Sequence, residues 1–283
     1  MKKLILWFLF DCIGKILPYF LIRFIASFFA ILLFIIGPRR KIILTNFKIV
    51  FHNSNNSFYL KLLFKYYFHI SILILEILKQ KHLKISQIRN HIKLENSELL
   101  ERNGKGLLIL SAHIGNWELI AASSSFFVKE KVHLVVKSQN DYGYMNSVRT
   151  VFGCGLIDVG VGAKLSVSIL SHKGSVAFLA DQTGSKSDPV YKFFDIETHT
   201  FTAPARLALK FKPKVIICFN NRQKNGKYVC KLKELKIDDL ENNQKGIDEF
   251  IKRYLYAMEE NIKQFPEQWL WSHKKWKHNS IYK

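Results

Sequence analysis

From about residue 90 onwards, short apolar runs alternate with segments in which apolar residues recur at helical spacing. The apolar runs of strand length are 107–110, 132–137, 155–159, 175–180, 215–220 and 228–235. The segments at helical spacing are 117–127, 142–152, 164–172, 203–211 and 247–264. A short apolar run bounded by glycine or turn residues is typical of a buried parallel strand. The alternation therefore predicts an α/β fold with a mostly parallel central sheet flanked by helices, in which the last two strands form a hairpin.

The first 37 residues are almost entirely apolar, and residues 16–37 carry a single charge, at Arg23. That length is about one bilayer span, roughly 20 residues. A signal peptide is the alternative, but Asp11 and Lys15 follow the first apolar run and no small-residue cleavage site precedes the next one. We therefore predict an uncleaved N-terminal membrane anchor over these 37 residues. Pro18 and Arg23 leave open a helix that lies in the membrane interface instead of crossing it.

Residues 38–283 are predicted to form a single α/β domain that begins with a helical extension over 38–90. Apolar residues recur at helical spacing from 41 to about 80, interrupted by the Asn- and Ser-rich loop 52–57. The basic stretch 38–41 (PRRK) places positive charge directly after the anchor. By the positive-inside rule, this flank keeps the rest of the chain on the cytoplasmic side of the membrane.

The chain of 283 residues has a hydrophobic fraction of 48% and a formal net charge of +21. This excess of positive charge favours anionic partners such as phospholipid headgroups, phosphorylated glycolipids or an acidic carrier protein. Nucleic acid is disfavoured, because the basic residues are dispersed and no recognised binding module is present. The four cysteines lie far apart without metal-ligand spacing. They are predicted to be reduced thiols of a cytosolic domain, and a disulfide between Cys218 and Cys230 is disfavoured.

Residues 106–119 (GLLILSAHIGNWEL) combine a strand, a turn and the start of a helix. Ligands bind beyond the carboxyl ends of strands in open α/β sheets, and His113 lies there, with Glu118 in the first helical turn. Histidine suits general-base catalysis near neutral pH, and a nearby carboxylate orients the ring and stabilises the imidazolium. The helix dipole favours an ionised Glu118 at this position.

No Gly-x-Ser-x-Gly nucleophile motif is present, although Ser111 lies two residues before the histidine. A histidine–carboxylate pair without a nucleophile suits direct transfer, in which the acceptor's own hydroxyl is deprotonated and attacks a thioester. The spacing alone is weak support, because 10 histidines and 22 acidic residues give roughly 0.8 such pairs by chance. The alternative is that His113 is a core histidine and Glu118 a helix-capping carboxylate.

The block HIGNWE at 113–118 resembles the His-x4-Glu motif of the bacterial lipid A biosynthesis (lauroyl/myristoyl) acyltransferases, within the glycerophosphate and lysophospholipid acyltransferase superfamily. The resemblance extends over most of the chain. Its further blocks are GPRRKIILTNFKIVF at 37–51, Asn140 and Arg149 ahead of GCGLIDVG, ADQTG at 180–184, TAPARLALKFKPKVIICF at 202–219 and PEQWLWSHKKWK at 266–277. The chain departs from the family at Asp195, where Phe-Phe-Gly is usual, and at Ile216 and Ile217, where a proline is common.

The resemblance implies a membrane-bound enzyme that moves a fatty acyl chain from acyl carrier protein to a hydroxyl of a lipid A precursor, without a cofactor or a metal. It implies that His113 is the general base and that Glu118 orients it. Arg149 would hold a substrate phosphate or the carrier's phosphopantetheine; the alternative is a surface arginine in a loose ion pair. Asp181 and Gln182 would line the site, or serve only in a turn or helix cap.

In the same family, Asn116 and the N–H groups of its turn would polarise the thioester carbonyl. The implied partners are acyl carrier protein, which is acidic, an anionic glycolipid acceptor and the membrane, and the charge of +21 suits all three. The implied location is the bacterial inner membrane, with the catalytic domain on its cytoplasmic face. The tail 266–277, rich in tryptophan and lysine, is predicted as an interfacial element or as a segment docked on the domain, and the two roles are compatible.

Two rival functions remain from the sequence. The first is an acyltransferase for another amphiphile, such as a phosphatidylinositol mannoside, an ornithine lipid or a lysophospholipid, because the sequence fixes neither the acceptor nor the chain length. The second is a non-enzymatic, membrane-anchored protein that binds anionic lipids.

Overall fold

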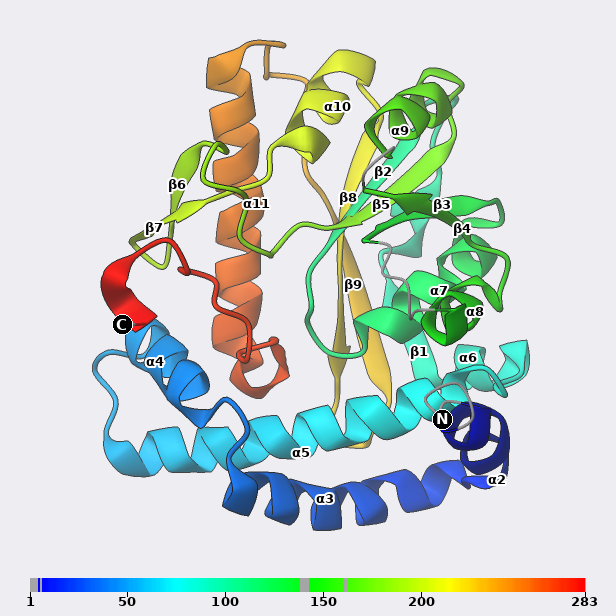
Figure 1. Cartoon of the computed structure of the whole chain (residues 1–283). Helices are drawn as coiled ribbons and strands as arrows, with labels where there is room; N and C mark the ends of the chain where they lie inside the picture. Colours follow the sequence, from blue (N-terminus) through cyan, green and yellow to red (C-terminus); the bar gives the residue numbers. More distant parts are fainter. Residues whose placement is uncertain (1–4, 6, 138–142, 160–161, 283) are drawn as a thin grey trace.

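Seven strands form one sheet at the centre of the molecule (Figure 1). The computed structural model describes residues 5, 7–137, 143–159 and 162–282. The strands are β1 (Ile92–Glu95), β2 (Leu107–Ser111), β3 (Val132–Val136), β4 (Gly155–Asp158), β5 (Ser175–Leu179), β8 (Lys214–Arg222) and β9 (Tyr228–Glu234). Their order is β1-β9-β8-β2-β5-β3-β4, and every pair is parallel except β8 and β9, which form an antiparallel hairpin. The predicted α/β fold with a mostly parallel sheet is confirmed.

Helices cover both faces of the sheet, as a parallel sheet requires. One face carries α7 (Trp117–Val128) and α8 (Gly143–Thr150), and the other carries α9 (Gly162–Ser171), α10 (Ala203–Phe211) and α11 (Gln244–Gln264). Leu107 and Ile109 of β2 pack on the α7 side. Leu108 and Leu110 pack in the core on the α10 and α11 side. Because successive side chains of a strand point to opposite faces, β2 is apolar throughout and buried on both sides.

The N-terminal part of the chain is helical and lies across one end of the sheet (Figure 1). Its main helices are α3 (Ile22–Ile36), α4 (Arg40–Val50), α5 (Asn56–Gln80) and α6 (Ile85–His91). The elements that precede α3 are η1 (Phe8–Ile13), α2 (Gly14–Ile16) and η2 (Tyr19–Leu21). Leu17 and Pro18 have extended backbone and interrupt this series. Of the described residues, 19–36 and 56–80 form helices long and apolar enough to cross a membrane, judged by length and composition.

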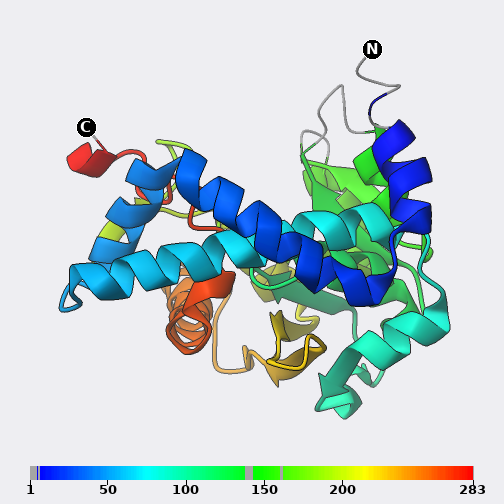
Figure 2. The same cartoon turned by 90° about the horizontal axis from the view of Figure 1, so that it is seen from below.

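Helix α3 lies along α5, which separates it from the sheet (Figures 1 and 2). Ile22, Ala26 and Ala30 are fully buried on the side that faces α5. The opposite side is an exposed stripe of large apolar residues, here named the α3 stripe, which consists of Phe20, Phe24, Phe28, Ile31 and Ile35. Their exposed fractions run from 50% to 80%. A contiguous exposed apolar surface of this kind marks an interaction with a protein or a membrane.

A second, two-stranded sheet of β6 (Val190–Phe193) and β7 (Ile196–His199) is absent from the sequence-based prediction. Phe194 and Asp195 form its turn with φ values of 49° and 59°. A two-residue hairpin turn with positive φ at both positions normally favours glycine or asparagine. Asp195, which stands where the resembled family has glycine, therefore occupies a left-handed turn position, and aspartate tolerates that region better than most residues.

The C-terminal tail is docked in the protein core. Trp269, Trp271 and Trp276 have exposed fractions of 1%, 0% and 1%. A tryptophan that anchored the protein at a membrane interface would present its ring to the lipid headgroups. The interfacial prediction is therefore wrong for these tryptophans, and the docked alternative is confirmed. All four cysteines are free thiols, as predicted.

The turn between β2 and α7 approaches β8 so closely that only glycine fits at position 115. Gly115 has a φ of 61°, and a Cβ atom there would lie 1.8 Å from the carbonyl oxygen of Asn220. The backbone N–H of Gly115 donates to the carbonyl of Gln268 at 2.9 Å, and that of Asn116 donates to the carbonyl of Asn220 at 3.3 Å. Strand β8 and the C-terminal tail thus fix the backbone of this turn.

We expect Gly115→Ala to lower the free energy of unfolding by more than Gly104→Ala does. Gly104 also has a positive φ, 79°, but has no heavy atom within 4 Å of a built Cβ. Gly104→Ala therefore loses only the free energy needed to hold a non-glycine residue in the left-handed backbone region, about 1–2 kcal/mol. In Gly115→Ala, the overlap with a backbone oxygen adds about 1–3 kcal/mol. Urea unfolding of the two variants measures the difference, and equal losses would contradict the close approach.

Candidate functional site

The ends of β2 and β5 bring His113 and Asp181 together. The register of these parallel neighbours pairs Ser111 with Leu179, the last residue of each strand. His113 and Asp181 each follow two residues later, so both lie at the same edge of the sheet. The N–H of Ala180 donates to the carbonyl of Ser111 at 2.9 Å, which extends the pairing past the strand ends.

Asp181 is the carboxylate that is bonded to His113. Its Oδ1 lies 2.7 Å from Nδ1 of the imidazole, and the exposed fractions of the two side chains are 16% for His113 and 4% for Asp181. The indole Nε1 of Trp269 donates to Oδ2 of the same carboxylate at 3.0 Å. With its proton on Nδ1, the neutral ring keeps Nε2 as its basic nitrogen. This geometry corrects the prediction that Glu118 orients His113.

Glu118 is instead held by Arg149. The guanidinium Nε donates to Oε2 at 2.8 Å and Nη2 donates to Oε1 at 2.6 Å, which is the bidentate geometry of a strong arginine–carboxylate pair. The exposed fractions of the side chains are 6% for Glu118 and 18% for Arg149. Arg149 is therefore not the loosely paired surface arginine of the alternative, and its guanidinium contacts a carboxylate. That it also holds a substrate phosphate stays a prediction.

Asn116 is the N-terminal cap of α7, and both polar atoms of its amide have hydrogen-bond partners. Its Oδ1 accepts from the N–H of Leu119 at 2.9 Å, and its Nδ2 donates to Oε2 of Glu76 at 2.8 Å. The backbone N–H groups of residues 114–116 donate to the carbonyl oxygens of Ala112, Gln268 and Asn220, respectively. These donors have protein partners, and their polarisation of a thioester carbonyl stays a prediction.

Glu76 of α5 connects the β2–α7 turn, through Asn116, to the segment before α3, through Tyr19. Its carboxylate has an exposed fraction of 4%. Oε1 accepts from the hydroxyl of Tyr19 at 2.8 Å, while Oε2 accepts from Asn116 and from the hydroxyl of Tyr228 on β9. Three donors from three parts of the chain thus satisfy one buried charge, which would otherwise be costly to bury. Glu76 lies within the apolar helical pattern of α5, which gives no signal in the sequence for a buried carboxylate with three donors.

The electrostatics favour an ion pair between His113 and Asp181. Burial disfavours the imidazolium, and the positive charge of Arg149 also lowers the pKa of His113. The charge and hydrogen bond of Asp181, together with the charge of Glu118, outweigh these two effects, so the pKa of His113 is raised. Burial likewise disfavours the carboxylate of Asp181, but His113, Trp269 and Lys275 hold its pKa well below the usual range. A reaction that needs neutral His113 therefore gains rate as the pH rises through a pKa above the ordinary histidine value.

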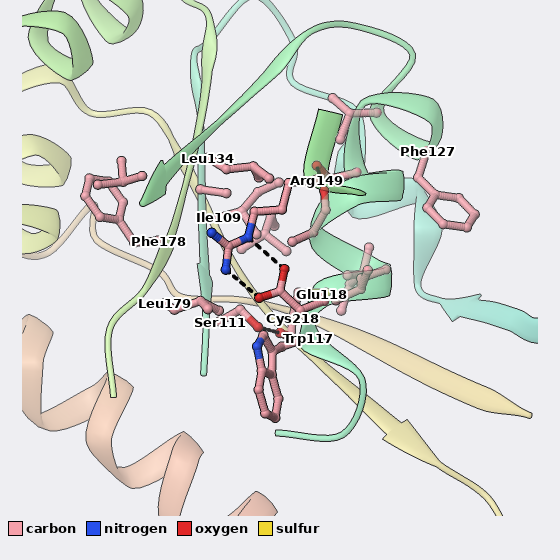
Figure 3. A pocket seen from close by; sticks show the side chains of 18 of the residues that line it. Ile109, Ser111, Trp117, Glu118, Phe127, Leu134, Arg149, Phe178, Leu179 and Cys218 are labelled. Carbon is pink, nitrogen blue, oxygen red and sulfur yellow. Dashed lines mark hydrogen bonds and ion pairs between the residues drawn. The ribbon is translucent and has the colours of Figure 1, made fainter. Parts of the chain in front are cut away.

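An apolar cavity lies beside this site, between the sheet and α7 (Figure 3). The space among its lining residues is about 800 Å³, counted together with the part that opens to solvent. The Glu118–Arg149 pair and Ser111 supply polar groups, and Ile109, Phe127 and Leu134 are among the apolar lining residues. Trp117 also lines the cavity, and its ring contacts the ring of His113 with centroids 5.1 Å apart. Trp117 therefore connects the lining of the cavity to the imidazole.

The remaining predicted residues are less closely tied to the site. Gln182 follows Asp181 with an exposed side chain, and its carbonyl lies 3.5 Å from Nζ of the buried Lys275. Asn140 lies outside the described residues. Sequence reasoning missed Trp269 and Lys275 as neighbours of Asp181, although the tail block that contains them belongs to the family resemblance. In the described part of the chain, no three His, Cys, Asp or Glu side chains gather as a candidate metal site.

A buried histidine–carboxylate pair at the strand ends and an apolar cavity suit an enzyme that transfers acyl chains. The family model described as "Bacterial lipid A biosynthesis acyltransferase" matches residues 3–278, so the chain belongs to that family of enzymes. A solved structure that is similar is the 1-acyl-sn-glycerophosphate acyltransferase of Thermotoga maritima, with 11% sequence identity and a TM-score of 0.41. The alignment covers 85% of this chain and 97% of that chain. No curated protein matches the chain.

We expect Asp181→Asn to lower the pKa of His113 by about one to three pH units, because it removes the charge in contact with the imidazole while preserving the side-chain shape. Titration of the His113 ring by NMR measures the midpoint. Glu118→Gln is the control, since it removes an equal charge that acts only through space, and its shift is expected to be smaller. A larger shift in Glu118→Gln than in Asp181→Asn would contradict the assignment of Asp181 as the bonded partner.

Proposed function

We propose that this protein transfers a fatty acyl chain from acyl carrier protein to a hydroxyl of a lipid A precursor, by direct general-base catalysis. Membership of the family supplies the reaction class and the lipid A context. The observation that carries the mechanism is the His113–Asp181 pair, whose imidazole contacts Trp117, a lining residue of the apolar cavity. The donor, the acceptor and the order of steps are the proposal.

In the proposed reaction, a single side chain, His113, first accepts and then returns the proton. Nε2 of His113 takes the proton of the acceptor's hydroxyl as its oxygen attacks the thioester carbonyl carbon. Asp181 holds Nδ1–H and stabilises the imidazolium that forms. The tetrahedral intermediate then breaks its carbon–sulfur bond, and the imidazolium returns the proton to the departing thiolate. The products are the new ester and the free thiol of the carrier, and the base is neutral again.

The apolar cavity is the proposed site of the acyl chain. Burial of hydrocarbon contributes about 0.8 kcal/mol per methylene group, so an apolar lining binds an acyl chain without needing directional contacts. The Glu118–Arg149 pair lies on its wall, and each charge is neutralised by the other. An acyl chain therefore passes this point without facing an unpaired buried charge, which would be costly. In this role the pair shapes the cavity, and Glu118 also favours the imidazolium of His113.

The charge of the chain suits the proposed partners. Lysine and arginine number 43 against 22 acidic residues, so an acidic carrier protein, an anionic glycolipid and an anionic membrane surface are all attracted. The proposed location is the bacterial inner membrane, with the catalytic domain on its cytoplasmic face, where the basic residues after α3 favour retention.

Helix α3 is proposed to lie in the membrane surface. Its buried side packs along α5, and α5 in turn buries Tyr66, Tyr67 and Glu76 against the rest of the domain. If α3 crossed the bilayer, α5 and its polar contacts would be carried into the hydrocarbon, where unsatisfied polar groups are costly. A helix that lies in the interface with its apolar stripe buried avoids this cost.

We expect cells without this protein to make lipid A that lacks one secondary acyl chain, measured as a mass difference of one acyl group by mass spectrometry. Expression of the wild-type protein restores the chain. Expression of His113→Ala does not, because loss of a general base lowers the rate by roughly 10²-fold or more. His172→Ala is the control, since the exposed His172 directly follows α9 and precedes β5, whereas Asp181 follows the opposite end of β5.

Purified protein tests the donor and the acceptor separately. Acyl carrier protein and coenzyme A thioesters are each supplied with a lipid A precursor and with a lysophospholipid, and product is measured by mass spectrometry. Transfer from the carrier thioester to the lipid A precursor is expected. Transfer to the lysophospholipid alone would identify a lysophospholipid, and not a lipid A precursor, as the acceptor. The proposal as a whole would be overturned if lipid A were unchanged in the deleted strain and no mixture gave a product.

We expect the double variant Phe24→Ser/Phe28→Ser to bind vesicles of anionic phospholipid roughly 100-fold or more weakly than the wild type. Each phenylalanine of the α3 stripe loses about 1.5–3 kcal/mol of apolar burial. Co-sedimentation with vesicles measures the partition coefficient. Tyr256→Ser is the control, because Tyr256 is 62% exposed on α11, away from the stripe. Unchanged binding of the double variant would rule out the stripe as the membrane surface.

A further inference from the structure

The C-terminal segment 266–276 is built into the turn that carries the base. The N–H of Leu270 donates to the carbonyl of His113 at 3.0 Å. The N–H of Gly115 donates to the carbonyl of Gln268 at 2.9 Å, and Trp269 forms a β-bridge with Ile114. This segment therefore supports the backbone of His113 like an additional strand at the edge of the turn.

The same segment reaches the carboxylate that orients the base. Trp269 donates its indole N–H to Oδ2 of Asp181 at 3.0 Å, while His113 lies 2.7 Å from Oδ1. Asp181 and Trp269 have exposed fractions of 3% and 1%. Two donors, one on each oxygen, fix the rotation of the carboxylate about its Cβ–Cγ bond, a torsion that is otherwise broad. Without the indole N–H, Oδ2 would lose this partner in a buried position, which is unfavourable.

Trp269 is itself held rigidly. Its ring contacts the rings of Trp271, Phe193 and Trp276 with centroids 4.7, 5.7 and 6.4 Å apart. Edge-to-face contacts of this kind add to the burial energy of aromatic side chains and fix their orientation. The indole N–H is therefore aimed at Asp181 by the packing of the tail and of β6, and not by the carboxylate alone.

We propose that Trp269 is a positioning residue for acyl transfer, whose indole N–H holds Asp181 in the orientation that accepts from Nδ1 of His113 and leaves Nε2 as the base. This inference rests on the proposed function. Trp269 acts through Asp181 without touching the reacting atoms. Its loss therefore lowers kcat, which depends on the orientation of the base, and leaves KM nearly unchanged.

The test compares Trp269→Phe with Trp276→Phe in the full-length enzyme. Both tryptophans are 1% exposed and pack against Phe193, so the two variants lose the same ring volume. In the described structure, Nε1 of Trp276 is buried without a hydrogen-bond partner, so only Trp269→Phe removes a bond to Asp181. We expect kcat to fall roughly 10-fold in Trp269→Phe. KM should change less than about twofold, and kcat should fall by clearly less in Trp276→Phe, which alters the packing around Trp269 but keeps its bond to Asp181.

A double-mutant cycle with Asp181→Asn shows whether the effect passes through Asp181. Trp269→Phe should cost little further kcat in the Asp181→Asn background, because the group it positions is already altered. If Trp269→Phe does not fold, 3-benzothienylalanine at position 269 keeps the ring shape and replaces only the N–H by sulfur. Equal kcat values for the two tryptophan variants, or additive losses in the cycle, would overturn the inference. An inactive wild-type enzyme would instead overturn the proposed function.

Discussion

The register between β2 and β5 is the constraint on which the site depends. It pairs Ser111 with Leu179, so the residues two positions beyond them, His113 and Asp181, meet at the same edge. A slip of one residue would turn the side chains of one strand to the opposite face and separate the pair. The neighbouring strand β8 and the C-terminal tail bind the β2–α7 turn from its other sides through backbone hydrogen bonds. The position of one imidazole is thus fixed by three adjacent strands and a segment from the end of the chain.

The parts of the site that could be predicted from the sequence are the local ones. The run of apolar residues before His113, the glycine in the turn and the helical spacing after it lie within one short stretch, so strand, turn and helix follow from periodicity. The partner of His113 does not follow from periodicity, because Asp181 is 68 residues away and meets the histidine only through the order of the strands in the sheet. Glu118 was the nearer candidate, but Arg149 from α8 engages it. The density of tryptophan in the tail is equally typical of a membrane interface and of a core, and only the ring packing around Trp269 distinguishes them.

The buried charges of the site come in matched pairs. His113 faces Asp181, and Glu118 faces Arg149. Buried pairs of this kind add little net stability, because desolvation of the charges offsets their attraction. They are better understood as a condition of function, since the Glu118–Arg149 pair lines the apolar cavity and each carboxylate keeps its own partner. The imidazole is then the group whose protonation changes during the proposed reaction, while the Glu118–Arg149 pair stays constant.

The bonds of Glu76 have a consequence for where the chemistry takes place. Helix α5 packs on α3 on one side, and through Glu76 and Asn116 it is bonded to the β2–α7 turn on the other. The separation between α3, the helix proposed to face lipid, and that turn is therefore about one helix diameter, roughly 10 Å. The headgroup region of a bilayer leaflet is about 5–8 Å thick. In the proposed orientation, a lipid that reaches His113 rises by little more than the depth of its own headgroup, and most of its hydrocarbon stays out of water.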